Sequence, residues 1–534
     1  MKKLLTLCLA LALLLCGCAK PQESAPSSVQ TEPPSSVQTE PPSESEPTEP
    51  VQSVDNSAFG LSYLPSYGLN PFTCAATVNR AVFSLVFESL FVVSNQFRAE
   101  PLLCDSFTAS EDGRTYYYTI LSGVSFSDGT PLTAKDVVAS LNAARDSELY
   151  SGRLSHVTQV SAWEENVVCI TLNTAYENFS LMLDVPIVKA DTVSGAAPVG
   201  TGPYAIDNNV LRRNETWWQE REPAVHAATI PLDAAGSSND IRDDFEFGST
   251  DLVYCDPNAA AAVGYRCDYE VWEVPTTILH YIGFNVNDGI FSNAALRTAV
   301  TYLIDRDTLS NGAYGGFATP TTLPCAPDSD LYDAQLAAEY TYNLPRFKAA
   351  VNNSGVVSTA DAPGVLLVCS DDPTRVAVAE QLVEAFRSCG IYLKLKSLPL
   401  KEYRAELYDG NFDLYYGEVR LAANFDLAPF FAPNGYLCYG GLSGTGLSGL
   451  CASALENSGN YPELCTKILE SAPICPVVFK SYAIYVTRGK LSAITPGVDC
   501  LFHTSATART LADADRTYDR TQDASEPPSE PENP

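Results

Sequence analysis

Side chains that could carry out covalent or metal chemistry are sparse in this chain of 534 residues. Its four histidines show no metal-ligand spacing among themselves or with cysteines; they are His156, His226, His280 and His503. A G-x-S-x-G nucleophile motif does not occur. We therefore expect no catalytic residue, no metal site and no cofactor. Asp and Glu are abundant, so a carboxylate-dependent hydrolase remains an alternative, without a motif in its favour.

Cysteine is frequent, with sixteen copies. Cys8, Cys16 and Cys18 belong to the N-terminal segment, and the remaining thirteen are scattered, with no C-x-x-C pair. A secreted disulfide scaffold would be short and cysteine-dense, which this chain is not. We expect buried free thiols, with a local bridge such as Cys255–Cys267 as the alternative.

Two further stretches could bind ligands. "GTGLSG" (Gly444–Gly449) has the spacing of a dinucleotide loop, but such a site needs a strand leading directly into it. The preceding "CYGGLS" is typical of a glycine-rich loop instead, so we expect no nucleotide site. "TWW" (Thr216–Trp218) could stack on sugars or peptide side chains, or could simply pack in a core.

The charge balance excludes nucleic acid as a partner, because phosphate binding needs clustered Lys and Arg, whereas this chain has a net charge of −31 and a pI near 4.4. Such acidity is typical of the solvated surface of an exported protein. A preference for cationic ligands is the alternative explanation.

The N-terminus predicts export and lipid attachment. "MKKLLTLCLALALLLCGCAK" has two lysines and an apolar run too short to span a bilayer, which identifies 1–17 as a signal peptide. "LCGC" resembles a bacterial lipobox, with Cys18 as the lipidated residue; a plain signal peptide is the alternative. Residues 18–57 form a Pro/Ser/Glu tether with "SSVQTEPP" repeated in tandem, and we expect this tether and the acidic tail 508–534 to be disordered.

The ordered part alternates between helical and strand-like segments. Strands are expected at 115–121, 166–173, 364–370 and 391–398, and helices at 81–93 (running toward a strand), 295–309 and 376–390. The order strand, helix, strand over 364–398 predicts a βαβ unit with parallel strands. The whole is predicted to be an α/β protein of several lobes.

"VSFSDGTPLTAKDVVASL" (Val124–Leu141) is the most strongly specified local segment. Asp128–Gly129 predicts a turn, and Thr133 with Asp136 three residues later is a capping-box variant that starts a helix. Every polar residue here has a structural role, so we expect scaffold rather than a ligand site.

That segment also carries a family resemblance. "YYYTILSGVSFSDGTPLTAKDVVASL" is similar to the pattern G-V-x-F-x-D-G-T-P-x-T-A-x-D-V of the family 5 extracellular solute-binding proteins, the oligopeptide- and dipeptide-binding subunits of ABC importers. Further segments resemble the family in the correct order: 69–107, "PVGTGPYAI" (Pro198–Ile206), 281–309 and 381–419. Together they span roughly 59–507.

The resemblance implies an α/β, periplasmic-binding-protein-like fold (type II, cluster C), with two lobes closing by a hinge around a ligand and an extra subdomain. The implied divisions are lobe I at 58–93 with 201–284 and 476–507, the extra subdomain (lobe II) at 94–200, and lobe III at 285–475. The implied protein is a non-catalytic monomer on the outer face of the cytoplasmic membrane, at the cell surface or in the periplasm. It would deliver peptides or peptide-like solutes to an ABC permease and ATPase, while a cell-surface hydrolase and a peptide sensor or adhesin are alternatives.

The chain departs from the resemblance in "GEVRLAANFDLAPFF" (Gly417–Phe431). Peptide-binding members usually carry a tryptophan here and then an acidic residue that pairs with the peptide's amino terminus, whereas this chain has Ala423, with Asp426 three residues later. Arg420 could instead receive a ligand carboxylate, or could form a surface or inter-lobe salt bridge. The residues expected to bind ligand are Arg420, Asn424, Asp426, Phe425 and Tyr416.

Overall fold

The computed structural model describes residues 58–219, 221–259, 264–491 and 494–502. The predicted signal peptide, Cys18, the tether and the acidic tail lie outside the described residues. Among the helices that are described, none combines the length and the apolar character needed to cross a bilayer.

One sheet of four strands joins distant parts of the chain. β1 (Leu61–Tyr63) runs parallel to β12 (Thr229–Ala234), and β11 (Val210–Arg213) and β10 (Tyr204–Asp207) follow in antiparallel order. α1 (Arg80–Val86) packs beside it and buries five of its seven residues. The expected helix at 81–93 is therefore confined to this short segment, and the chain then becomes extended.

A second sheet of four antiparallel strands lies within residues 104–172. Its order is β5 (Cys104–Ala109), β6 (Thr115–Ile120), β8 (Val167–Leu172) and β7 (Val157–Ala162). α2 (Ala134–Asp146) packs on β7 and β8. The two strands expected here from β-branched and aromatic residues are confirmed.

The turn that leads into α2 is built as the sequence predicts. Gly129 has a φ of +82°, in the region that favours glycine. The Asp136 carboxylate accepts hydrogen bonds from the backbone N–H (3.0 Å) and the hydroxyl (2.7 Å) of Thr133. The segment thus serves as scaffold, as expected.

The largest sheet has seven strands. They are β13 (Leu252–Cys255), β19 (Ile474–Thr487), β14 (Tyr269–Phe284), β18 (Leu414–Arg420), β16 (Gly364–Cys369) and β17 (Leu393–Leu398), in that spatial order, with β15 (Ala318–Pro320) paired to β19. α8 (Pro373–Arg387) connects β16 to its parallel neighbour β17, which confirms the predicted βαβ unit. α9 (Leu400–Asp409) then leads to β18, which lies parallel to β16 on its other side.

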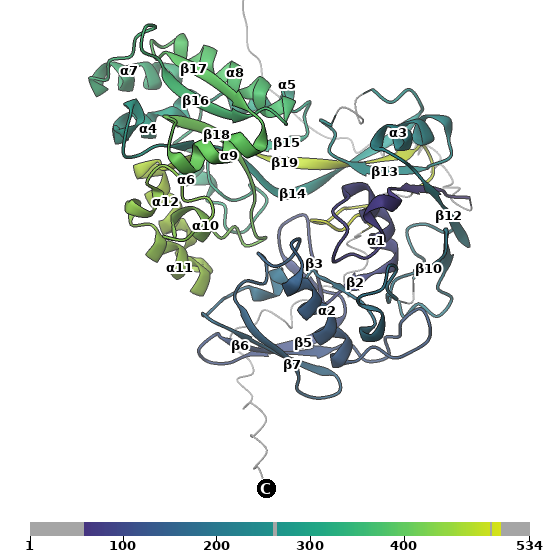
Figure 1. Ribbon diagram of the computed structural model, residues 1–534. Coiled ribbons are helices and arrows are strands. Elements are labelled where there is room, and N and C mark those ends of the chain that lie inside the picture. Colours follow the sequence, from purple (N-terminus) through teal and green to yellow (C-terminus); the bar gives the residue numbers. More distant parts are fainter. Residues whose placement is uncertain (1–57, 220, 260–263, 492–493, 503–534) are drawn as a thin grey trace, which may run out of the picture. The chain divides into compact units, whose positions relative to one another are not determined.

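β14 and β19 are the longest strands and pair antiparallel (Figure 1). Their register shifts between Val274 and Ile278, where Pro275 interrupts the ladder. The hydroxyl of Thr276 donates to the Lys480 carbonyl, and that of Thr277 donates to the Leu421 carbonyl at 2.7 Å. The Thr276 side chain thus replaces part of the backbone pairing with β19, while Thr277 holds β14 to the residue that follows β18.

The expected helix at 295–309 is split. The structure has α4 (Ala294–Ala299), a 3₁₀ turn (Val300–Tyr302) and α5 (Arg306–Gly312). Asp305 begins the second helix, because its carboxylate accepts from the N–H of Thr308 at 3.1 Å. The apolar periodicity runs through the break, so periodicity alone does not reveal it.

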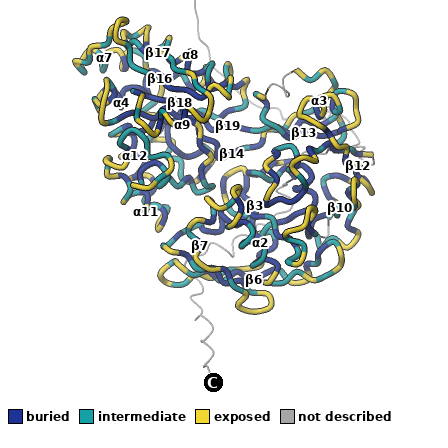
Figure 2. The backbone as a smooth tube through the Cα atoms, viewed as in Figure 1, coloured by how far each residue is buried: buried dark blue, intermediate teal, exposed yellow. Residues whose placement is uncertain are grey.

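The remaining elements are short. They are the strand pairs β2 (Glu88–Ser89) with β9 (Pro186–Ile187) and β3 (Phe91–Val93) with β4 (Ala99–Pro101), and the helices α3 (Ser238–Phe247), α6 (Ala334–Ala338), α7 (Leu344–Ser354), α10 (Ala428–Phe431), α11 (Ser448–Glu456) and α12 (Tyr461–Ser471). Figure 2 shows that the strands β14, β16, β18 and β19 run through largely buried surroundings.

Cys255 and Cys267 are both free thiols, so the alternative of a local bridge is wrong.

Candidate functional site

β18 and the loop that follows it contain all five residues expected to bind ligand. Side chains alternate along a strand, so Tyr416, Glu418 and Arg420 share one face of β18. Tyr416 is fully buried, and its hydroxyl is 2.8 Å from that of Tyr314. The structure therefore places Tyr416 within a core and Arg420 at the end of the strand, one-third exposed.

The loop after β18 is held by Phe425 and Asp426. Phe425 is buried at a φ of +56°, and its ring packs against Phe97 with centroids 5.0 Å apart. The Asp426 carboxylate accepts from the N–H of Ala428 at 2.9 Å, and burial raises the pKa of Asp426. Asn424 differs, because its Oδ1 is buried without a hydrogen-bond partner in the part of the chain that is described.

Arg420 lies beside a cavity of about 180 Å³ in which three guanidinium groups surround one carboxylate. Arg80 Nη1 is 2.5 Å from Asp499 Oδ1, Arg420 Nη1 is 3.4 Å from Asp499 Oδ2, and Arg153 Nη2 is 3.9 Å from the same oxygen. We call Arg80, Arg153 and Arg420 the arginine cluster. Arg153 also pairs with Asp184.

The four charged groups come from segments far apart in the sequence. Arg80 begins α1, Arg153 lies in the connection after α2, Arg420 ends β18, and Asp499 lies in a turn near the C-terminal limit of the described residues. Asp499 has a φ of +56°, a conformation that Asp adopts more readily than most residues. The site thus depends on elements from all three predicted lobes.

The arginine cluster determines the ionisation of this cavity. Burial alone would raise the pKa of Asp499, but the charges of Arg80, Arg420 and Arg153 outweigh it and hold that pKa well below its ordinary value. Burial raises the pKa of Asp184, and the charge of Arg153 opposes this shift. Asp499 is therefore a carboxylate at neutral pH.

Arg221 adds a fourth guanidinium to the wall of the same cavity. Its Nε donates to the Gln219 side chain at 2.6 Å, and its guanidinium lies 5.2 Å from the centre of the Trp217 ring. Burial lowers the pKa of Arg221, and no described carboxylate lies within ion-pair distance of it. The cavity therefore carries an excess of positive charge.

The tryptophans of "TWW" have a structural role here. The indole N–H groups of Trp217 and Trp218 donate to the Glu88 carboxylate at 3.2 and 2.7 Å, and Thr201 and Gln219 donate to it as well. Burial raises the pKa of Glu88, and these hydrogen bonds oppose that shift. Trp217 and Trp218 therefore hold the Glu88 carboxylate, and Trp217 also lines the cavity.

A larger cavity of about 670 Å³ is lined in part by Ala423 and Asn424 of the loop after β18. Aromatic rings form much of its wall, namely Phe91, Phe97, Phe107, Tyr116 and Phe179, and Asn424 also lines it. Arg98 pairs with Asp330 through two contacts at its rim, at 2.6 and 2.7 Å. The Glu177 carboxylate accepts from the N–H and the hydroxyl of Ser458, at 2.6 and 2.8 Å.

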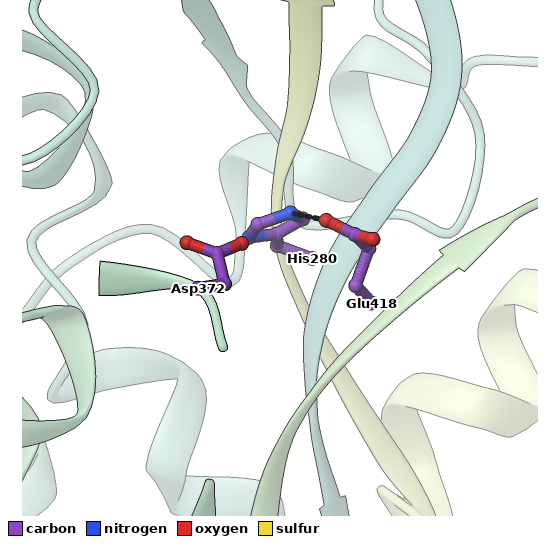
Figure 3. Close-up of side chains that lie close together, drawn as sticks. All are labelled: His280, Asp372 and Glu418. Carbon is purple, nitrogen blue, oxygen red and sulfur yellow. Dashed lines mark hydrogen bonds and ion pairs between the residues drawn. The ribbon is translucent and has the colours of Figure 1, made fainter. Parts of the chain in front are cut away.

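A third group of ionisable side chains, His280, Asp372 and Glu418, lies close together in Figure 3, with one ligand-type atom of each within 4.8 Å of the others. His280 Nε2 is 2.8 Å from the Glu418 carboxylate, and Nδ1 is 2.7 Å from the Tyr314 hydroxyl. Asp372 accepts from Arg375 Nε at 3.2 Å. Since both ring nitrogens are hydrogen-bonded and Arg375 pairs with Asp372, the group is a satisfied network rather than an open metal site.

Sequence reasoning identified Arg420 but not Arg80, Arg153, Arg221 or Asp499. None of these lies in a local motif, and their proximity follows only from tertiary packing.

"GTGLSG" lies in a 3₁₀ turn (Leu442–Thr445) and the start of α11, without a strand leading into it. This arrangement lacks the strand that a dinucleotide site needs.

Comparison with known proteins identifies the family. The family model described as bacterial extracellular solute-binding proteins, family 5, matches residues 98–440, which is more than half of the chain. The chain belongs to this family. Since the family consists of binding proteins, this family 5 protein is not an enzyme, and the resemblance noted from the sequence is confirmed.

Curated relatives of this family 5 protein include the glutathione-binding protein GsiB of Escherichia coli O1:K1, which is 27% identical over 306 residues. The alignment covers 54% of this chain and 59% of GsiB. GsiB of Escherichia coli K12 is 26% identical over the same length. The chain thus spans about three-fifths of the length of the curated relatives it matches.

Solved structures confirm the predicted fold class. The substrate-binding protein CtaP of Listeria monocytogenes aligns with a TM-score of 0.68 at 19% identity, covering 83% of this chain and 97% of CtaP. AppA of Clostridium difficile gives a TM-score of 0.67 at 18% identity, with coverage of 83% and 98%. AppA of Bacillus subtilis, solved with a nonapeptide, gives 0.57 at 17% identity, with coverage of 83% and 96%.

Proposed function

We propose that this family 5 protein is the solute receptor of an ABC importer and that it takes peptides or peptide-like solutes carrying a carboxylate. The observation that carries the proposal is that the end of β18 lines a cationic cavity through Arg420, while the loop that follows lines a larger aromatic cavity through Ala423 and Asn424. One solute spanning both cavities would place an acidic group against arginines and apolar groups against rings.

Each expected site residue has a distinct part in this proposal. Arg420 receives the solute carboxylate through its planar fork, since its own contacts to Asp499 are long. Asn424 offers its unpartnered Oδ1 to an N–H of the solute backbone. Phe425 and Asp426 hold the loop, and Tyr416 supports β18 from the core.

The relatives are consistent with such ligands. GsiB is described as glutathione-binding, and AppA of Bacillus subtilis was solved with a nonapeptide. Both names refer to peptides, which end in a carboxylate. This chain lacks the acidic residue expected to bind a peptide amine, so we propose that recognition is anchored at the acidic end.

The proposal includes the arrangement of the whole chain. Residues 1–17 are a signal peptide, lipid on Cys18 and the tether hold the receptor at the outer face of the cytoplasmic membrane, and a permease with its ATPase is the partner. Lobes I, II and III, divided as the sequence predicts, close around the solute by shifting an open–closed equilibrium. The receptor acts as a monomer.

Mass spectrometry of small molecules that co-purify with the full-length chain tests the proposal directly. We expect a peptide-like acid, which should also raise the melting temperature and compact the protein in solution scattering when it is added back. If a panel of peptides, glutathione and amino-acid metal complexes produces neither effect, the receptor function is wrong. Globomycin-sensitive processing at Cys18 tests the lipid anchor separately.

A further inference from the structure

We propose that the arginine cluster forms an anion subsite and that the Asp499 carboxylate competes with the solute for it. A solute carboxylate would replace Asp499 at Arg420 and Arg153, while Asp499 stays paired with Arg80. This inference rests on the proposed function and deepens it, because it assigns the solute class to anions and gives one residue control of the affinity. Asp499 then acts as a specificity-determining residue rather than as a direct ligand for the solute.

The three contacts of Asp499 differ in length, which supports replacement of Asp499 by a solute carboxylate at two of the three arginines. Its contact with Arg80 is short, at 2.5 Å, whereas those with Arg420 and Arg153 are 3.4 and 3.9 Å. A charge-assisted hydrogen bond between nitrogen and oxygen is normally about 2.7–2.9 Å long. Arg420 and Arg153 therefore keep N–H donors that a better-placed carboxylate can use.

The numbers of guanidinium and carboxylate groups in the small cavity also favour an anion subsite. Four guanidinium groups line the small cavity, but only Asp184 and Asp499 pair with them among the described residues. Arg153 is committed to Asp184 and Arg80 to Asp499, which leaves Arg420 with only a long contact to Asp499, and Arg221 without a described carboxylate within ion-pair distance. An incoming anion would correct this excess at a site that is already partly desolvated.

The backbone presents Asp499 to the cavity independently of the arginines. Gly497 and Cys500 form a tight turn through two backbone hydrogen bonds of 3.0 and 3.3 Å, and Val498 is tied to Val93 at 2.9 Å. Asp499 lies at the tip of this turn with its side chain mostly buried. Its carboxylate can therefore stay near Arg80 while its second oxygen is replaced at Arg420.

The first test compares carboxylate binding by the wild-type chain and Asp499→Asn. Removal of the internal charge should raise the affinity for trialanine about tenfold and leave the affinity for trialanine amide unchanged, as measured by titration calorimetry. Asp268→Asn is the matched control, since it removes an exposed partner of Arg488 and should change neither affinity. Equal affinities of wild type and Asp499→Asn for trialanine would overturn the proposal.

A second test does not require the natural solute. Asp499→Gly fits the positive φ, so it removes the carboxylate without straining the turn, and its melting temperature should fall because the arginine cluster loses its counter-ion. Millimolar acetate should restore part of that loss, whereas the same concentration of acetamide should restore none. Failure of acetate to act more strongly than acetamide would contradict an anion subsite at this position.

Together the two tests distinguish failure of the inference from failure of the proposed function. If acetate rescues Asp499→Gly but no peptide or other solute of the panel binds, the anion subsite stands and the receptor function fails. If trialanine binds the wild type and neither Asp499 variant alters carboxylate binding or rescue, the receptor function stands and the role of Asp499 is wrong.

Discussion

Two hydrogen-bonded pairs of ionisable side chains lie next to each other on one face of β18 and differ in how completely their hydrogen bonds are formed. Glu418 accepts from His280 at 2.8 Å, and His280 is bonded at its other nitrogen to Tyr314. Arg420, two residues further on, reaches Asp499 only at 3.4 Å, although its side chain and that of Glu418 are equally exposed, by about one-third. Glu418 and Arg420 therefore differ in hydrogen-bond completeness rather than in exposure, and in the function proposed above this difference leaves Arg420 able to receive a carboxylate.

Glu418→Ala removes the completely hydrogen-bonded pair of the two and should have the largest effect on the free energy of unfolding. The change leaves His280 buried without its partner, so we expect a loss of about 2–4 kcal/mol in the free energy of unfolding. Urea denaturation measures it. Glu418→Gln, which keeps an acceptor for the imidazole N–H, should lose clearly less, and equal losses for both variants would contradict a role based on this hydrogen bond.

The pH dependence of the free energy of unfolding should show the second-largest effect, through the ionisation of Glu418 and His280. Burial alone would raise the pKa of Glu418, but the hydrogen bond from His280, the charge that His280 carries when protonated, and the charges of Arg375 and Lys480 lower it to about 2. Because an unfolded Glu titrates near about 4.3, Glu418 stabilises the fold above that pH, and this contribution is lost as the pH falls toward 2. Burial also lowers the pKa of His280, so the unfolded chain takes up a proton first below about pH 6.5.

Unfolding curves measured between pH 7 and pH 2.5 test both signs. Glu418→Gln should flatten the decline below about pH 4.3, and His280→Gln should flatten it just below about pH 6.5. A wild-type stability that rises on acidification through these windows would contradict the assignment.

Arg420→Ala tests the proposed role of Arg420 in binding a solute carboxylate. We expect the free energy of unfolding to change by less than about 1 kcal/mol, because the contacts are long and partly exposed. The affinity for trialanine should fall about tenfold, with trialanine amide unaffected. Arg387→Ala, which removes an exposed helix-surface pair, is the control for loss of an arginine, and an identical affinity profile for both variants would exclude a role for Arg420 in binding.

The ion pair at the rim of the larger cavity should have the smallest effect. Arg98 and Asp330 make two short contacts, but both side chains are more than half exposed. A double-mutant cycle of Arg98→Ala and Asp330→Ala should give a coupling energy of at most about 1 kcal/mol in unfolding. A substantially larger coupling would mean that this pair is desolvated and belongs with the structural group.

Much of the fold could be predicted from local sequence, but the sites could not. The βαβ unit and the capped start of α2 follow from apolar periodicity and from Thr133 with Asp136, because these signals act over a few residues. The pairing of His280 with Glu418 joins positions 138 residues apart, and it depends on the register between two strands. The arginine cluster and Asp499 similarly come from four distant segments, so no short-range pattern could reveal their proximity.

The interruption between β14 and β19 has a mechanical consequence. Residues Pro275–Thr277 have no ladder partners on β19; the Thr276 hydroxyl bonds to β19 instead, and the Thr277 hydroxyl bonds to Leu421, which follows β18. A hydroxyl can exchange its partner for water by rotating one bond, whereas a backbone ladder opens only when several bonds are lost together. This stretch therefore resists bending less than an uninterrupted ladder would, and the two strands can flex here without unzipping the sheet on either side.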